Sequence, residues 1–328
     1  MATLLVLILL VACIVAGLVW FTASTARGVE AELPPRGRFI DIDGQRIHYI
    51  DTGGSGPAVV LIHGLGGNLL NFSYMVDKLA GDFRVILVDR PGSGYSTRPA
   101  NASATITAQA ATLATLFRRL GLKRPLLVGH SLGGALSLAI ALDHPDCAAA
   151  LALISPLTHA QQDVPEMFKG LVIGSPLLRN IIAWTVATPI TIRQGPKVLQ
   201  TVFAPDAVPS DFPTRGGGLL GLRPNAFYGA SSDIVVINEV LPGYMARYHS
   251  LGIPLAILFG RGDHVLDFRD QAEAMKVKIP ALELELMEGG HMLLVAAPDR
   301  CVALVRRVAD ELRGAPASSV GTFPEARK

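Results

Sequence analysis

The side chains with the clearest chemical potential are a serine, an aspartate and a histidine, in that order along the chain. Ser131 is the centre of the pentapeptide Gly129–Gly133, which reads Gly-His-Ser-Leu-Gly. Asp263 follows Phe-Gly-Arg-Gly, and His291 follows Glu-Gly-Gly. An imidazole can take the proton of a hydroxyl, and a carboxylate can orient that imidazole. The pattern therefore predicts Ser131 as a nucleophile, His291 as its base and Asp263 as the orienting acid.

Ser131 has the local setting that a strained serine turn requires. An apolar run, 125–128, precedes it, and a helix-compatible run, 134–142, follows it. Glycine at positions 129 and 133 keeps side chains out of the turn, and the N-terminus of the following helix places partial positive charge beneath the hydroxyl. The competing interpretation is an ordinary serine that caps a helix.

Other residues compete for the roles of acid and base. Asp267 is the alternative acid, but Asp263 comes directly after an apolar run and a Gly-x-Gly turn. The alternative bases are three further histidines. His130 is fixed beside the nucleophile, His63 opens a loop and is expected to serve structure, and His264 adjoins the preferred acid.

A glycine-rich segment after the apolar run 58–62 is a candidate oxyanion hole. Residues 63–67 read His-Gly-Leu-Gly-Gly. Backbone N–H groups in such a loop stabilise a developing oxyanion, and we predict Leu65 and Leu132 as the two donors. The segment lacks the Lys-Ser/Thr pair of a phosphate-binding loop, and it does not fit the G-x-G-x-x-G pattern.

Alternating strands and helices are expected to position these residues. Apolar residues around Asp43-Gly44 predict a hairpin, and later apolar runs predict buried strands. The predicted strands are 58–62, 84–88, 125–128, 150–154, 254–259 and 282–287, and helices are predicted near 72–80, 105–120 and 298–312. This alternation is typical of a mostly parallel sheet with helices on both faces.

The chain is expected to divide into five parts. Residues 1–26 form a transmembrane anchor, 27–37 a linker, 38–154 with 251–313 an α/β core, 155–250 an inserted and mostly helical cap, and 314–328 a disordered tail. The cap contains an apolar stretch, 170–192, which Pro176, Arg179 and Pro189 mark as unsuited to a second membrane span. We expect a lid packed on the core; the alternative is a lid that lines an acyl-chain pocket or touches the bilayer.

The N-terminal segment carries no charge from Ala2 to Phe21. About 20 helical residues span a hydrocarbon core of roughly 30 Å. We therefore predict that one anchor localises the protein to a membrane. The arginines that follow the segment favour a cytoplasmic position for the rest of the chain, but they do not settle on which side of the membrane it lies. Two alternatives stay open: a signal peptide cleaved near residues 24–26, and lipidation at Cys13.

Composition bounds the partners. The chain has 328 residues, a formal net charge of +2 and no cluster of Lys and Arg, so we expect no nucleic-acid partner. Its three cysteines, Cys13, Cys147 and Cys301, lack metal-ligand spacing, and no metal site is predicted.

Together these motifs resemble those of the α/β-hydrolase superfamily. The resemblance rests on segments 63–67, 89–94, 129–134, 260–263 and 290–291. It implies an eight-stranded, mostly parallel sheet and no cofactor. Related haloalkane dehalogenases and epoxide hydrolases use an Asp nucleophile, which Ser131 disfavours, and His130 disfavours the carbon–carbon bond hydrolases that often have Asn there.

The resemblance implies a serine esterase or lipase that cleaves esters of apolar acyl groups, such as a monoacylglycerol, through an acyl-enzyme on Ser131. Two alternatives use the same triad: a serine-dependent perhydrolase or haloperoxidase, and a carbon–carbon bond hydrolase. A third alternative belongs to another class, a non-catalytic ligand receptor on the same fold.

Overall fold

An eight-stranded sheet forms the centre of the molecule in the computed structural model, which describes residues 1–314. Its strand order is β1-β2-β4-β3-β5-β6-β7-β8. The strands are β1 (Arg38–Ile42), β2 (Gln45–Asp51), β3 (Ala58–Ile62), β4 (Arg84–Val88), β5 (Leu126–His130), β6 (Ala150–Ile154), β7 (Leu255–Gly260) and β8 (Glu283–Met287). β2 pairs antiparallel with β1 and with β4, and all other pairs are parallel. The predicted α/β fold with a mostly parallel sheet is confirmed.

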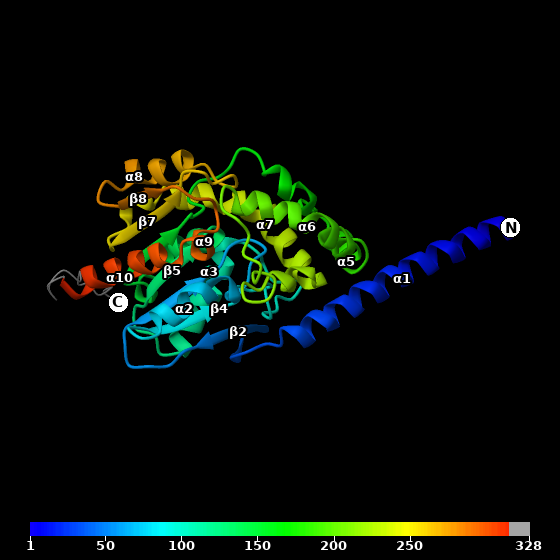
Figure 1. The fold of residues 1–328 in the computed structure, drawn as a ribbon, viewed down its shortest axis with the longest axis horizontal. Coiled ribbons are helices and arrows are strands. Elements are labelled where there is room, and N and C mark those ends of the chain that lie inside the picture. Colours follow the sequence, from blue (N-terminus) through cyan, green and yellow to red (C-terminus); the bar gives the residue numbers. More distant parts are fainter. Residues whose placement is uncertain (315–328) are drawn as a thin grey trace, which may run out of the picture.

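Helices cover both faces of this sheet (Figure 1). One face is packed by α3 (Ile106–Arg119), α4 (Leu132–Asp143) and α8 (Ala274–Lys278), and the other by α2 (Ser73–Leu79), α9 (Leu293–Ala296) and α10 (Pro298–Gly314). Successive residues of β5 alternate between them: Leu127 joins one apolar cluster, while Leu126 and Val128 join the other. The central strands are apolar throughout because both of their faces are buried.

Residues 155–250, called the cap from here on, connect β6 to β7 with helices. They are α5 (Pro176–Trp184), α6 (Ala187–Phe203) and α7 (Pro224–Met245), with the short 3₁₀ helices η3 (Glu166–Leu171), η4 (Gly218–Leu222) and η5 (Tyr248–Ser250). Leu241 and Tyr244 of α7 belong to the same apolar cluster as α3 and α4. The last part of α7 is therefore anchored in the core.

Helix α1 runs without interruption from Ala2 to Glu32 and projects from the body beside the cap (Figure 1). It is long and apolar enough to cross a membrane, by length and composition. Residues 27–32 of the predicted linker 27–37 therefore belong to this helix. Thr22 and Val29 are buried on this part of α1, and no proline interrupts the helix before Pro34. The tail predicted to be disordered lies outside the described residues, except Gly314, which ends α10.

Candidate active site

The predicted site residues follow strands that are neighbours in the sheet. Segment 63–67 follows β3, Ser131 follows β5, Asp263 follows β7 and His291 follows β8. These strands, with β6, are consecutive and parallel. Their carboxyl ends therefore meet at one edge, where the ligands of open α/β sheets bind.

Ser131 adopts the strained backbone of a sharp strand-to-helix turn. Its φ is 54° and its ψ is −122°, a conformation that a non-glycine residue rarely adopts. The turn is held on both sides. The Ser131 N–H donates to the Ile154 carbonyl (3.2 Å), and the Ser131 carbonyl accepts from the N–H groups of Gly134 (2.8 Å) and Leu157 (2.9 Å).

Three glycines allow this turn to pack tightly. A Cβ on Gly129 would lie 2.5 Å from the Gly133 carbonyl oxygen, across the turn, whereas a Cβ on Gly133 would collide with the Ile62 carbonyl at the end of β3. A Cβ on Gly64 would lie 2.8 Å from the Ser131 Cβ. The glycine-rich loop after β3 therefore lies directly against Ser131.

His291 is paired with Asp263. The Nδ1 of His291 lies 2.7 Å from Oδ2 of Asp263, and both side chains are buried. The other carboxylate oxygen of Asp263 accepts from the N–H groups of Val265 (2.7 Å) and Leu266 (2.9 Å). Asp267, the alternative acid, is exposed and accepts from a neighbouring backbone N–H of its own loop. The structure thus brings Asp263, and not Asp267, to the histidine.

His130 supports the backbone of His291. Its Nε2 lies 3.0 Å from the His291 carbonyl oxygen, so Nε2 carries the proton and donates. The two rings are 4.8 Å apart. Burial, followed by the proximity of His291, holds the pKa of His130 well below its usual value. His130 is thus a neutral supporting residue, and His264 is exposed.

Within residues 1–314, Ser131 Oγ and His291 do not share a hydrogen bond, and His130 is the residue that connects their backbones. With Nδ1 of His291 directed at Asp263, its Nε2 remains available as a proton acceptor. Hydrogen bonds between a nucleophile and its base often tighten only when substrate binds.

His63 supports the loop that follows β3. Its Nδ1 donates to the Gly64 carbonyl (2.8 Å), and its Nε2 accepts from the Arg90 N–H (3.0 Å). Burial, and then the charge of Arg90, lowers the pKa of His63 to about 4. His63 is therefore neutral near pH 7 and has no free nitrogen to act as a base, which agrees with the structural role expected for it.

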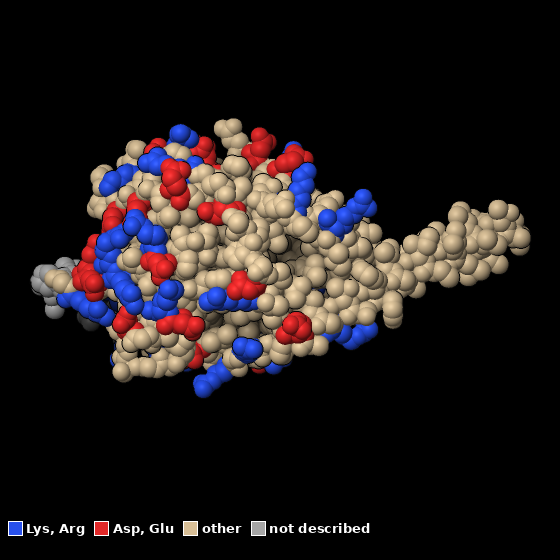
Figure 2. Space-filling model, viewed as in Figure 1, with Lys and Arg blue, Asp and Glu red and all other residues tan. Residues whose placement is uncertain are grey.

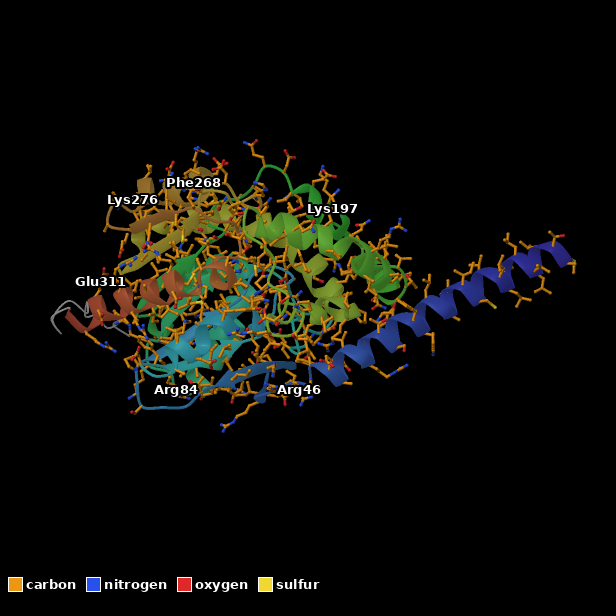
Figure 3. All side chains as sticks on the ribbon, viewed as in Figure 1. Arg46, Arg84, Lys197, Phe268, Lys276 and Glu311 are labelled. Atoms are coloured by element: carbon orange, nitrogen blue, oxygen red, sulfur yellow. The ribbon has the colours of Figure 1, made fainter. Side chains whose placement is uncertain are left out.

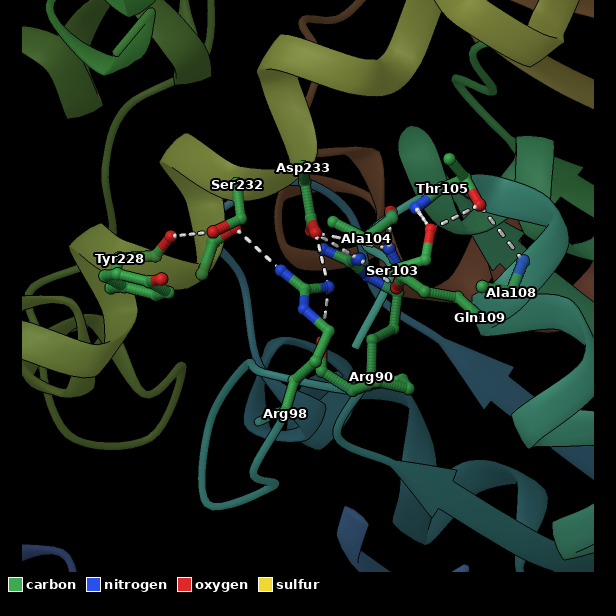
Figure 4. Close-up of polar contacts among 12 residues, drawn as sticks. Arg90, Arg98, Ser103, Ala104, Thr105, Ala108, Gln109, Tyr228, Ser232 and Asp233 are labelled. Carbon is green, nitrogen blue, oxygen red and sulfur yellow. Dashed lines mark hydrogen bonds and ion pairs between the residues drawn. The ribbon is translucent and has the colours of Figure 1, made fainter. Parts of the chain in front are cut away.

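The fully buried Arg90 joins this loop to the cap (Figure 4). Its guanidinium donates to the carbonyls of His63 (3.0 Å) and Gly64 (3.0 Å). The same guanidinium also donates to Asp233 of α7 (2.8 Å) and to Gln109 of α3 (2.9 Å). The sequence motifs predict no individual role for any of these three polar side chains. A local motif marks Arg90, because it lies in the Asp-Arg-Pro-Gly segment, whereas no local motif marks Asp233.

The N–H groups of Leu65 and Leu132 donate to no protein acceptor within the described part of the chain. The N–H of Leu65 belongs to the same peptide as the Gly64 carbonyl, and the two point in opposite directions. Arg90 and His63, which both donate to that carbonyl, therefore also fix the direction of the Leu65 N–H.

A second connection joins the cap to the loop that carries His291. Asp206 accepts from the Gly290 N–H (2.8 Å).

The described residues contain no group of three or more His, Cys, Asp or Glu side chains placed to hold a metal ion.

These features define an α/β-hydrolase. The family model described as the alpha/beta hydrolase fold matches residues 57–298, and the chain belongs to this family.

Relatives of the chain differ in how much of it they match. An uncharacterised protein of Mycobacterium tuberculosis is 30% identical over 304 residues, covering 87% of this chain and 84% of that protein. The acetyltransferase component of the acetoin cleaving system of Cupriavidus necator is 37% identical over 120 residues, but this stretch is only 37% of this chain and 32% of that protein.

Among solved structures, a bacterial membrane phospholipase A described as a virulence factor superposes with a TM-score of 0.67 at 26% identity. The match covers 96% of this chain and 100% of the phospholipase chain. Esterases and lipases with lower identity share the fold. The likeness to the phospholipase extends over nearly the whole chain, beyond the core that the family model matches.

Proposed function

We propose that this protein is a membrane-anchored serine hydrolase that cleaves carboxylic esters of apolar acyl groups. The observation that carries the proposal is the strained turn at Ser131, with φ 54°, between the glycine-rich loop and the His291 segment. A non-glycine residue keeps such a strained conformation only where the surrounding structure enforces it, and residues of this kind are concentrated at functional sites.

The proposed reaction is acyl transfer in two steps. His291 Nε2 takes the Ser131 proton while Oγ bonds to the ester carbonyl carbon, and Asp263 stabilises the imidazolium. The N–H groups of Leu65 and Leu132 stabilise the oxyanion. The ester bond breaks, and the alcohol leaves with the proton from His291. Water then gives a proton to His291 and attacks the acyl carbon. The bond from Oγ of Ser131 to that carbon breaks, His291 returns the proton to Oγ, and the carboxylic acid leaves.

A lipid-like substrate is supported by two features. The structural neighbour at 26% identity is a membrane phospholipase A. Helix α1 has the length and apolar composition of a membrane span, and its C-terminal part contacts the cap through Thr22 and Glu30. An anchor joined to a cap would keep the site near ester lipids.

Hydrolysis of p-nitrophenyl esters of increasing acyl length, by the wild-type protein and Ser131→Ala in parallel, tests this proposal. We expect turnover by the wild type and a loss of at least about a thousandfold in the variant. The chain-length profile then gives the size of the acyl pocket. A folded wild type that cleaves none of these esters, or a variant with unchanged activity, would contradict the proposal.

A further inference from the structure

The exposed large apolar side chains of this protein gather in two segments. In the part of the chain that the structure describes, they lie within residues 1–21 of α1 and within 172–192 of the cap, apart from Val277. The cap residues, called the cap apolar face, are Val172, Leu177, Leu178, Ile181, Trp184, Val186, Ile190 and Ile192. Apolar surface concentrated in this way usually marks a site of interaction.

The cap apolar face lies beside the place where α1 leaves the body (Figures 1 and 2). The hydroxyl of Thr22 donates to the Thr185 carbonyl (3.4 Å), and both residues are buried. About two turns further along α1, Val29 is buried and Glu30 pairs with Arg223 of the cap (2.9 Å). Helix α1 and the cap are therefore joined.

The two tryptophans of the chain lie at the same level along α1. Trp20 precedes Thr22 by two residues, and Trp184 directly precedes Thr185, the residue that Thr22 contacts. Trp20 is 68% exposed and Trp184 is 41% exposed. Tryptophan is enriched where a bilayer meets water. If α1 enters a bilayer with Trp20 at its surface, the cap presents Trp184 to the same surface.

Charged residues are placed to suit this orientation. Arg179 lies in the sequence of the cap apolar face but is buried, where it donates to the hydroxyls of Ser231 (3.0 Å) and Ser232 (3.0 Å). Exposed cations flank the apolar segments. Lys169 precedes the cap segment, Arg193 and Lys197 follow it on α6 (Figure 3 labels Lys197), and Arg27 follows the apolar part of α1. Cations in these positions can reach lipid phosphates while the apolar side chains enter the bilayer.

We propose that the cap apolar face docks on the phospholipid bilayer that α1 enters, with anionic headgroups around its rim. This inference rests on the membrane anchor of the proposed function. Docking makes the cap a second membrane contact and holds the site beneath it against the leaflet that contains the ester lipid. In Figure 2 the densest group of charged side chains lies at the end of the body far from α1, which fits a body that faces water there.

Tryptophan fluorescence of the full chain in vesicles tests the proposal. Trp20→Phe leaves Trp184 as the only tryptophan, and Trp184→Phe leaves Trp20. Each is reconstituted into phosphatidylcholine–phosphatidylglycerol vesicles with ordinary or brominated acyl chains, because bromine quenches only tryptophans that reach the chains. A third protein, with both tryptophans replaced by Phe and Val277→Trp, places the reporter at the exposed apolar site on α8 that lies outside the two segments.

We expect bromolipid to reduce the emission of both Trp20 and Trp184 by at least about half, as for side chains at an interface, and to leave the reporter at position 277 unchanged. Quenching of Trp20 without quenching of Trp184 would overturn the docking and leave the anchor standing. Quenching of neither would overturn both. Hydrolysis of a soluble ester by the same preparations shows separately whether the proposed chemistry holds.

Discussion

Nη1 of Arg90 lies 2.8 Å from Oδ2 of Asp233, so that a carboxylate of cap helix α7 is paired with the guanidinium that holds the Gly64 carbonyl. Arg98 pairs with the other oxygen of Asp233 (2.7 Å) and donates to the Pro91 carbonyl (3.0 Å). The side chains of both arginines are buried with that of Asp233, but only Arg90 contacts the glycine-rich loop after β3. The cap and the candidate oxyanion hole are therefore parts of one polar network.

This asymmetry gives a matched pair of variants. In Arg90→Lys the single ammonium cannot hold both carbonyls of the loop and Asp233, so the direction of the Leu65 N–H is fixed less firmly, through His63. We expect kcat to fall by about ten- to a hundredfold, with KM changed much less. Steady-state kinetics on a soluble ester measures both constants.

Arg98→Lys is the control, because it disturbs the same carboxylate without touching the loop. It should lower the melting temperature to an extent similar to Arg90→Lys and change kcat by less than about threefold. Equal losses of kcat in the two variants would show that Arg90 acts through stability alone.

The orienting acid is tested by a second pair. Asp263→Asn cannot accept the Nδ1 proton of His291 as a carboxylate does, and the imidazole loses its tautomer and its charge partner. We expect kcat to fall by about a thousandfold or more. Asp267→Asn alters an exposed carboxylate of the same loop and should leave kcat within about twofold. The reverse order of effects would assign the acid to Asp267.

Acid should destabilise the folded protein through its buried histidines. Burial lowers the pKa of His63 and of His159 to about 4, from 6.5 in an exposed histidine. Between these values the unfolded chain binds protons that the folded chain does not, so the free energy of unfolding decreases as the pH falls from about 6.5 to 4. Above 6.5 both states are neutral and this contribution vanishes.

Unfolding by urea at several pH values measures this effect. In His159→Gln the decrease in unfolding free energy between pH 6.5 and 4 should be smaller than in the wild type, because one group that binds a proton only on unfolding is gone. His249→Gln, at an exposed position, should leave the pH dependence unchanged. An equal slope in the wild type and His159→Gln would refute this explanation.

Removal of residues 2–21 separates membrane contact from chemistry. The deletion leaves Thr22 and Val29, the buried contacts of α1 with the body, in place. We expect hydrolysis of lipid dispersions to fall by at least about tenfold, because the anchor supplies a high local concentration of lipid, while hydrolysis of soluble esters stays unchanged. An equal loss on both substrates would indicate a structural role for the segment.

Much of the fold could be predicted from local patterns. Central strands such as β3 and β5 are buried on both faces and therefore read as short apolar runs. The turn at Ser131 needs Gly129 and Gly133 for steric reasons that are visible in five residues. The pairing of His291 with Asp263 was predictable because both follow strands at one sheet edge.

The features that were missed depend on contacts between distant segments. Asp233 is 143 positions from Arg90, and its importance arises only when α7 crosses the core. Likewise, no local sequence pattern predicts that α1 continues into the predicted linker. The C-terminal part of α1 is buried by contact with the cap, at Thr22 and Val29. Such pairings require knowledge of where the cap packs.

The most direct test of the central claim is to label the protein with a fluorophosphonate and locate the adduct by peptide mass spectrometry. The serine oxygen bonds to phosphorus, His291 takes the hydroxyl proton and fluoride leaves. A serine without such a base is too weak a nucleophile to react under the same conditions. We expect one adduct per chain, on Ser131, and none in His291→Ala under the same conditions. An unlabelled wild type that is folded, or an adduct on another residue, would contradict the assignment of Ser131 as the nucleophile.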